Sequence, residues 1–243
     1  MKKILIRVIL PLLVLAGLAK GLDILINARD FQFFGGITHR IDTDEKVVAL
    51  TFDDGPAENT DAILDILKKH QVKGTFYLIG SDLEKNMDKG KKIAAEGHEI
   101  GNHSYSHTRM VFKTPSFIRE EIEKTDELIR QAGYQGEIHF RPPYGKKFVF
   151  LPQYLSETGR RTITWDVEPE TYAEIDGNAE KITEHVLANT RPGSIILLHV
   201  MYENRKASLE SVDAIIQGLK AKGYRFVTVS ELLKLQPHSP SPS

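Results

Sequence analysis

VVALTFDDGP, residues 47–56, joins an apolar run to two adjacent aspartates and a turn. The apolar residues 47–50 are typical of a strand that is buried on both faces. Asp53 and Asp54 follow at the strand end, where neighbouring carboxylates repel each other unless a cation or a proton lies between them. Because Asp, Gly and Pro also form ordinary turns, this stretch alone is consistent with either a plain turn or a functional site.

The chain as a whole has the composition of one globular domain. It has 243 residues, a formal net charge of -1 and 41% hydrophobic residues, which is enough for a sizeable core. The near-neutral charge argues against nucleic acid as a partner, because such binding requires a basic surface. The chain has 0 cysteines and 9 histidines, so His, Asp or Glu must supply the ligands of any metal site.

Residues 1–28 are predicted to be a signal sequence or a membrane anchor. A basic flank precedes an apolar stretch over residues 8–19, which is the order found in export signals. Apolar residues continue to Ile26, and no small-residue cleavage site stands out. We therefore favour an uncleaved anchor with the domain outside the cytoplasm, and keep a cleaved, secreted form as the alternative. A buried core helix is disfavoured by the basic flank.

Strand patterns and helix patterns alternate over residues 46–235, which we expect to form a single domain. The expected strands cover residues 46–52, 74–80, 98–103, 138–145, 161–167, 193–200 and 224–230. The expected helices cover residues 60–70, 82–97, 115–133, 151–159, 178–190 and 207–223. About seven such alternations predict an α/β fold with a mostly parallel sheet, for which a (β/α) barrel is the closed form.

Two segments flank this domain. Residues 29–45 precede the first expected strand and are predicted to be a linker. Residues 236–243 are rich in Pro and Ser, a composition that predicts a disordered tail.

Side chains that bind metals or move protons collect at the predicted strand ends, where a (β/α) barrel builds its active site. Asp53 and Asp54 end the first strand, and His103 and His107 follow the third. A spacing of four places two imidazoles on one face of a helical turn. With a carboxylate they form a two-histidine, one-carboxylate set that leaves positions open for water and substrate. The alternative for the histidine pair is two solvated side chains in a polar loop.

Two further strand ends carry His199 and Arg141. His199 follows the apolar residues 195–198, and its place at a strand end favours an acid or base role over that of a core histidine. Arg141 precedes two prolines, a stiff segment that would hold the guanidinium in a fixed place. A surface arginine before a turn is the less favoured alternative.

Taken together, these motifs resemble the polysaccharide deacetylases, also called the NodB-homology domain or carbohydrate esterase family four. The motifs are TFDDGP (51–56), HSYSH (103–107), RPPYG (141–145), WDV (165–167) and LLH (197–199). One motif would be weak evidence, but five in order over about residues 46–233 are specific. The resemblance implies a distorted (β/α) barrel of about seven parallel strands. It also implies metal-dependent removal of N-acetyl or O-acetyl groups from polymers such as peptidoglycan, chitin or xylan.

The resemblance assigns the metal site and the catalytic base. It implies that Asp54, His103 and His107 bind a divalent metal, with zinc expected and cobalt, nickel or manganese as alternatives. Asp53 would then be the base that takes a proton from the attacking water. A metal bound to Asp54 would remove the conflict between the two adjacent carboxylates, so that Asp53 stays ionised.

The resemblance also assigns the remaining roles. His199 would protonate the leaving amine, and Arg141 would hold Asp53 in place. The backbone N–H near Tyr144 would share the oxyanion with the metal. The expected substrate-binding residues are Pro143, Tyr144, Trp165 and Tyr172.

The fourth motif departs from the family pattern. The family usually ends this motif in Asp-Trp, whereas this chain has Thr171 and Tyr172 at those places. Tyr172 still suits the wall of an apolar pocket, but Thr171 supplies no charge. His199 should therefore either have a lower pKa than in relatives or pair with Glu168, Glu170 or another acid.

The sequence therefore predicts a metal-dependent hydrolase that removes N-acetyl groups from a polysaccharide outside the cytoplasm. The expected substrate is cell-wall peptidoglycan or a chitin-like GlcNAc polymer, and the membrane is an expected partner through residues 1–28. One alternative is a non-catalytic cell-surface glycan-binding protein on the same fold, suggested by the altered fourth motif. Another is an O-acetyl esterase, which uses the same chemistry on a different leaving group.

Overall fold

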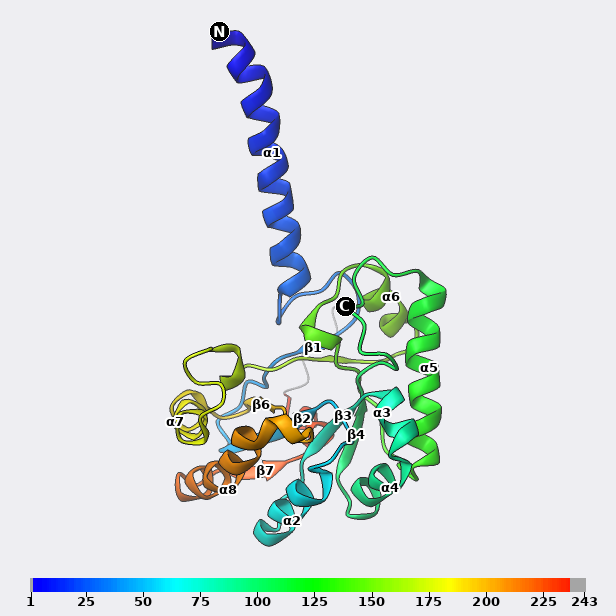
Figure 1. The fold of residues 1–243 in the computed structure, drawn as a ribbon, viewed down its shortest axis with the longest axis vertical. Helices are drawn as coiled ribbons and strands as arrows, with labels where there is room; N and C mark the ends of the chain where they lie inside the picture. The colour runs from blue at the N-terminus through cyan, green and yellow to red at the C-terminus, as the bar shows by residue number, and fades with distance from the viewer. Residues whose placement is uncertain (1, 237–243) are drawn as a thin grey trace, which may run out of the picture.

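The computed structural model of the chain describes residues 2–236, so nearly all of the predicted C-terminal tail lies outside the described residues. Parallel strands form the centre of the domain and helices surround them (Figure 1). The strands are β1 (Ile37–Thr38), β2 (Val47–Asp53), β3 (Thr75–Leu78), β4 (Glu99–Asn102), β5 (Thr162–Ile163), β6 (Ile195–Leu198) and β7 (Arg225–Val227). β2 pairs with β3, β6 and β7, β3 pairs with β4, and β1 pairs with β5, all in parallel.

Single-residue bridges connect these strands into a distorted barrel. Phe140 pairs in parallel with Asn102 of β4 and with Thr162 of β5. Val167, in the segment that follows β5, pairs in parallel with Ile196 of β6. Because β6 pairs with β2, these links run from β2 through β3, β4 and β5 back to β2. The predicted α/β fold with a parallel sheet in a single domain is confirmed.

One predicted strand and the predicted linker differ from the structure. The strand expected over 138–145 is reduced to the bridge at Phe140, because Pro142 and Pro143 lack the N–H that a continuing ladder needs. Part of the predicted linker belongs to the domain, since β1 pairs with β5 and Ile41 is fully buried.

The helices follow the predicted order. They are α2 (Thr60–His70), α3 (Gly80–Lys85), α4 (Met87–Ala95), α5 (Pro115–Gln131), α6 (Phe150–Glu157), α7 (Ala179–Asn189), α8 (Lys206–Ala221) and α9 (Val229–Leu233). The single helix expected over 82–97 is instead α3 and α4, separated by the non-helical Asn86. α9 replaces the end of the last expected strand, because Thr228 and Glu231 form a reciprocal capping box that starts a helix there.

α1 (Lys2–Asn27) projects away from the domain (Figure 1). Its segment Leu10–Asn27 has a mean hydropathy of 1.7 and is 0% buried. The helix is long and apolar enough to cross a membrane, a property that signal sequences share.

The side chains of β2 alternate between two apolar cores. One core lies between the strands and the surrounding helices and includes Leu50 and Phe52. The other includes Val47, Ala49 and the deep ring of Trp165. Since strand residues of the same parity share a face, Asp53 lies on the same face of β2 as Ala49 and Val47. The alternation therefore directs the carboxylate of Asp53 into the barrel at its C-terminal end.

Candidate active site

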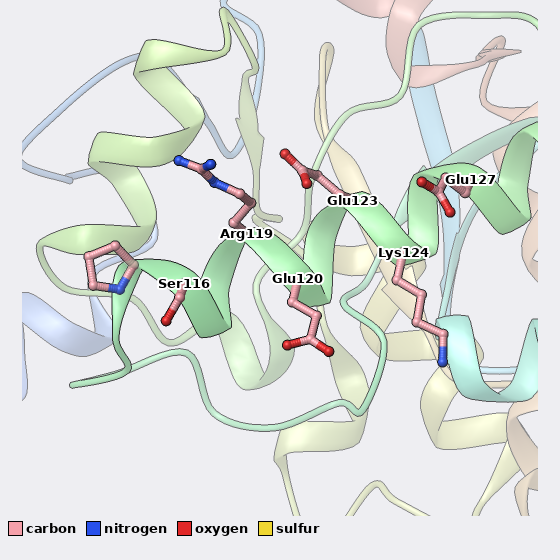
Figure 2. A pocket seen from close by; sticks show the side chains of 7 residues that line it. Ser116, Arg119, Glu120, Glu123, Lys124 and Glu127 are labelled. Carbon is pink, nitrogen blue, oxygen red and sulfur yellow. The ribbon is translucent and has the colours of Figure 1, made fainter.

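One cavity of about 380 Å³ collects most of the predicted functional residues at the C-terminal ends of the strands. Its walls include Asp53, Asp54, His103, His107, Tyr144, Trp165, Glu170 and His199. A hollow of about 520 Å³ lies elsewhere, along the outer face of α5 (Figure 2). That hollow is formed by charged side chains of one helix, such as Arg119 and Glu123, and contains none of the predicted catalytic residues. The chemistry therefore belongs to the first cavity.

Asp53 is buried and held by Arg141. Arg141 Nη1 donates to Asp53 Oδ1 at 2.6 Å and to Thr51 Oγ1 at 2.8 Å, and Nη2 donates to the Thr164 carbonyl at 3.2 Å. The guanidinium is fully buried and stacks 4.0 Å above the ring of Tyr77. Burial raises the pKa of the Asp53 carboxyl, although the charge and hydrogen bond of Arg141 oppose that rise. The carboxylate is thus fixed in direction and remains a competent proton acceptor.

Asp54, His103 and His107 converge on one point. Asp54 Oδ1 lies 3.4 Å from His107 Nε2 and 3.8 Å from His103 Nε2, and the two imidazole nitrogens are 3.2 Å apart. The three candidate ligand atoms all lie within 4.8 Å of one another. Asp54 has a left-handed φ of 73°, so the chain turns directly after Asp53 and separates the two neighbouring carboxylates.

The histidine pair does not lie on a helical turn, so that part of the prediction is wrong. Ser104 and His107 have positive φ values of 65° and 54°, and the segment is a loop. Side chains replace the missing helical hydrogen bonds: Asn102 Oδ1 accepts from the Ser104 backbone N–H at 2.8 Å, and Ser104 Oγ accepts from that of His107 at 3.1 Å. The loop brings the imidazoles together by a different route from the one expected.

The donor atoms fit a divalent metal. Asp54 Oδ1 is buried and has no hydrogen-bond partner among the described residues. His103 Nδ1 lies 2.7 Å from the Arg141 carbonyl oxygen, which only accepts, so Nδ1 carries the proton and Nε2 presents its lone pair. Burial, with the neighbouring His107, lowers the pKa of His103 to about 3 and keeps the imidazole neutral. Two imidazoles and one carboxylate are ligands that zinc and related ions take in catalytic sites.

His199 is paired with Glu170. The carboxylate accepts from His199 Nδ1 and from the His199 backbone N–H at 3.0 and 3.1 Å, and it also accepts from Ser208 Oγ. Burial alone would lower the pKa of His199, but the hydrogen bond and charge of Glu170 raise it to about 9. Burial likewise opposes ionisation of Glu170, yet the hydrogen bonds from His199 and Ser208 lower its pKa. The pair is therefore an imidazolium and a carboxylate at neutral pH.

This pair accounts for the altered fourth motif. Of the two expectations for His199, the structure supports pairing with an acid, and that acid is Glu170 rather than Glu168, which binds Arg29 and Trp165. The short turn Pro169–Thr171 points Glu170 at the end of β6. The charge that the family usually places one residue later is thus supplied by the preceding residue.

Two of the expected substrate-binding residues line the cavity and two do not. Tyr144 lines the cavity, and its ring centroid is 4.7 Å from that of His107. Trp165 also lines it, and its Nε1 donates to Glu168 at 2.8 Å. Within the described part of the chain, neither Pro143 nor Tyr172 belongs to the cavity wall. Pro143 is buried, and the Tyr172 ring packs on His185 with centroids 4.9 Å apart.

Arg29 lines the cavity although it lies in the predicted linker. Its guanidinium donates to Glu168 at 2.6 Å and lies 4.8 Å above the ring of Trp165. No local pattern distinguishes a single arginine in an irregular segment. Only the tertiary contacts bring it to the catalytic cavity.

Comparison with known proteins agrees with this geometry. A family model described as polysaccharide deacetylase matches residues 40–163, about half of the chain. The chain belongs to this family. The family is the one that the sequence motifs indicated, and the classification as a polysaccharide deacetylase, a hydrolase of carbohydrate esterase family four, is confirmed.

Curated relatives act on peptidoglycan according to their names. A peptidoglycan-N-acetylglucosamine deacetylase of Bacillus cereus is 42% identical, over 77% of this chain and 68% of the relative. The peptidoglycan-N-acetylmuramic acid deacetylase PdaA of Bacillus subtilis is 33% identical, over 88% of this chain and 79% of the relative. The peptidoglycan-N-acetylglucosamine deacetylase PgdA of Listeria monocytogenes is 38% identical, and the match spans only 39% of its length.

Solved structures share the fold. The Bc1960 peptidoglycan N-acetylglucosamine deacetylase superposes with a TM-score of 0.75 at 40% identity, covering 80% of this chain and 91% of that chain. BA3943 of Bacillus anthracis, described as a family-four pseudoenzyme, has a TM-score of 0.72 at 30% identity, covering 82% and 69%. The fold thus occurs in both active and inactive members.

Proposed function

We propose that this chain is a metal-dependent N-deacetylase of cell-wall peptidoglycan that acts on GlcNAc or MurNAc residues outside the cytoplasm. The observation that carries the proposal is the convergence of Asp53, the Asp54–His103–His107 set and His199 on one cavity. A binding protein has no need for a base, a metal set and an acid in one place. The names of the relatives support peptidoglycan as the polymer.

Asp54, His103 and His107 would hold the divalent metal, with zinc expected. An ion bound there would lower the pKa of the attacking water and polarise the acetyl carbonyl. His103 is oriented for this role by the Arg141 carbonyl, which fixes its tautomer.

Asp53 acts as the general base. Arg141 occupies its Oδ1, so Oδ2, which lies 3.6 Å from His103 Nε2, faces the metal set. This oxygen takes a proton from the water that attacks the acetyl carbon. The charge and hydrogen bond of Arg141 favour the ionised carboxylate and prevent it from rotating away.

His199 acts as the general acid. Its Nδ1–H donates to Glu170, which leaves the Nε2–H of the imidazolium for the cavity. As the carbon–nitrogen bond breaks, this proton passes to the sugar nitrogen, and the products are acetate and a free amine. Glu170 stabilises the charged imidazolium and orients the ring.

Two alternatives remain as outcomes of the test. A non-catalytic glycan-binding protein is suggested by the family-four pseudoenzyme BA3943, which has the same fold. The Glu170–His199 pair weighs against this alternative, because it restores the charge that Thr171 lacks. An O-acetyl esterase would use the same residues on a different leaving group, and one relative is named a bifunctional xylanase/deacetylase.

The test is acetate release from peptidoglycan, chitooligosaccharides and acetylated xylan after chelation and after addition of zinc, cobalt, nickel or manganese. We expect zinc-dependent release from peptidoglycan in the wild type and no release from Asp54→Asn. Glu174→Gln, a change on the exposed surface, is the matched control and should behave as the wild type. Release from xylan alone would indicate an esterase, and glycan binding without any release would indicate a non-catalytic protein.

We also propose that α1 is an uncleaved membrane anchor. Its basic N-terminal flank favours an orientation with the catalytic domain outside the cytoplasm. The exposed apolar helix, 0% buried over Leu10–Asn27, requires a lipid environment or removal.

A further inference from the structure

Four phenylalanine rings gather on the domain surface where α1 meets it. They are Phe31, Phe33, Phe112 and Phe148, here called the phenylalanine cluster. Phe33 packs edge-to-face on Phe31 and on Phe148, and Phe112 packs edge-to-face on Phe148, each pair with centroids 5.5 Å apart. Phe31 and Phe33 are each 45% exposed and Phe112 is 68% exposed. Contiguous exposed apolar rings of this kind mark an interaction surface.

The cluster is held against the C-terminal end of α1 by hydrogen bonds. The Lys147 backbone N–H donates to the Ile26 carbonyl at 3.3 Å, and the Lys147 ammonium donates to the Ala28 carbonyl. Lys146 Nζ donates to Asn27 Oδ1 at 2.8 Å. The last residues of α1 are therefore fastened to the segment that carries Phe148, and α1 leaves the domain beside the cluster.

Phe112 is presented to solvent by its backbone. Its φ of 56° lies in the left-handed region, which is unfavourable for a bulky residue and concentrates at functional sites. It belongs to the loop between β4 and α5, far from α1 in sequence. Figure 1 places α6 and the N-terminal end of α5 at the same end of the domain as the C-terminal end of α1. Segments distant in sequence thus contribute to one apolar surface around the helix.

We propose that the phenylalanine cluster inserts into the lipid headgroup region of the outer face of the membrane and holds the catalytic face against it. The inference rests on α1 being retained as the anchor, and it is independent of deacetylation. Phenylalanine is among the residues that segments lying on a membrane bury at the boundary between headgroups and acyl chains, and the cluster begins four residues after α1 ends at Asn27. Lys113 and Lys146 lie beside the cluster in sequence and suit anionic headgroups.

Docking in this way would place the catalytic cavity at the membrane surface. Arg29 and Tyr144 line the cavity, and both belong to the segments that carry the cluster. The substrate reached would be glycan within a few nanometres of the membrane, such as newly made strands, rather than the outer layers of the wall.

A glycan-stacking surface is the competing interpretation. The four rings pack against one another edge-to-face, so they do not form a flat row on which sugars stack. All four are phenylalanine, which lacks the hydroxyl or N–H that Tyr and Trp offer to a polar ligand. These features favour lipid.

The chain has 0 cysteines, so one introduced cysteine can carry a unique environment-sensitive fluorophore. The full-length protein is reconstituted into phosphatidylglycerol–phosphatidylethanolamine vesicles with the label at Phe112→Cys. Lys91→Cys, on α4 at the opposite end of the domain (Figure 1), is the matched control. We expect blue-shifted emission and quenching by headgroup-proximal doxyl lipids at position 112 and neither effect at position 91.

A second variant tests the cluster itself. Phe33→Ser, combined with the label at position 112, should reduce lipid quenching while the domain stays folded, because Phe33 is 45% exposed. If doxyl lipids quench the label at neither position 112 nor position 91, the proposal is overturned. Emission at position 112 that responds to soluble peptidoglycan fragments but not to lipids also overturns it, and identifies a glycan-binding surface instead. Because no readout depends on acetate release, an inactive enzyme would leave this test intact.

Discussion

Glu170 accepts hydrogen bonds from both the imidazole Nδ1 and the backbone N–H of His199. The two residues come from distant parts of the chain, Glu170 from the turn Pro169–Thr171 and His199 from the residue after β6. Because the carboxylate accepts the hydrogen bond from Nδ1–H, only Nε2–H is left for the cavity. The pair thus sets the direction of proton delivery as well as the charge of the acid.

Replacing Glu170 by Gln should lower the pKa of His199. The carboxylate raises that pKa to about 9 in the wild type, against the opposing effect of burial. Removing the negative charge favours the neutral imidazole, so the protonated acid is lost at lower pH. We expect the alkaline limb of the pH–rate profile for acetate release to move to lower pH in Glu170→Gln.

Thr171→Val and Thr171→Asp serve as controls for this prediction. Glu170 already supplies the charge, so Thr171→Val should leave the alkaline limb in place. A large upward shift in Thr171→Asp would mean that Glu170 orients His199 only weakly. If the limb stays unmoved in Glu170→Gln, another group must set the pKa of His199.

Asp53→Asn and Asp54→Asn should separate the base from the metal ligand. Asp54 Oδ1 lies 3.4 Å from His107 Nε2 within the ligand set, so Asp54→Asn should reduce bound zinc, measured by elemental analysis and titration. Asp53→Asn keeps an oxygen for Arg141 and should retain metal while kcat falls by about 10²- to 10⁴-fold, the usual contribution of a general base. Similar metal content and similar kcat in both variants would remove the basis for these roles.

Gly193→Ala should strongly destabilise the fold. Gly193 has a φ of 78°, and an added Cβ would lie 1.9 Å from the Ile41 carbonyl oxygen. That carbonyl belongs to backbone, so relief requires movement of the chain between β1 and β2. We expect a loss of about 3 kcal/mol in the free energy of unfolding, measured by urea denaturation.

Gly159→Ala is the matched control. Gly159 has a similar φ of 66°, but an added Cβ meets nothing within 4 Å among the described atoms. Only the left-handed backbone is penalised there, at about 1 kcal/mol. Equal losses in the two variants would show that the clash at Ile41 relaxes easily.

Local patterns predicted much of this fold because they report burial. The apolar run at 47–50 became part of the fully buried β2, and α2 covers the predicted residues 60–70. A (β/α) barrel is expected to build its active site at the C-terminal ends of its strands. Asp53, His103 and His199 lie at three such strand ends, and all three line one cavity.

The remaining features depend on long-range contacts or on unusual backbone. Ser104 and His107 adopt left-handed φ without being glycine, so the loop between them has no pattern that distinguishes it from a helical turn. Glu170 was one of several candidate acids, and only the placement of β6 selects it. Arg29 reaches the cavity because residues 26–29 are fastened to the domain by Lys146, Lys147 and Thr164.

Cell fractionation should place the full-length protein with the membrane, because α1 is apolar and unburied over Leu10–Asn27. Deleting residues 1–28 should move it to the soluble fraction. Deleting residues 1–22 is the matched control, since it retains the contacts of Ile26, Asn27 and Ala28 with the domain. A shortened, freely secreted wild-type protein would instead indicate a cleaved signal.

Arg29→Gln should weaken substrate binding without removing the metal. Arg29 forms one wall of the cavity, where it pairs with Glu168 and lies over Trp165. A hydrogen bond from this guanidinium to the glycan would contribute about 0.5 to 1 kcal/mol, so we expect KM to rise about two- to fivefold with zinc content unchanged. Arg29→Lys keeps the charge but loses the planar stacking and should give a smaller rise. A fall in kcat with KM unchanged would instead assign Arg29 to the chemical step, through the charge that it places near Glu168 and the acid His199.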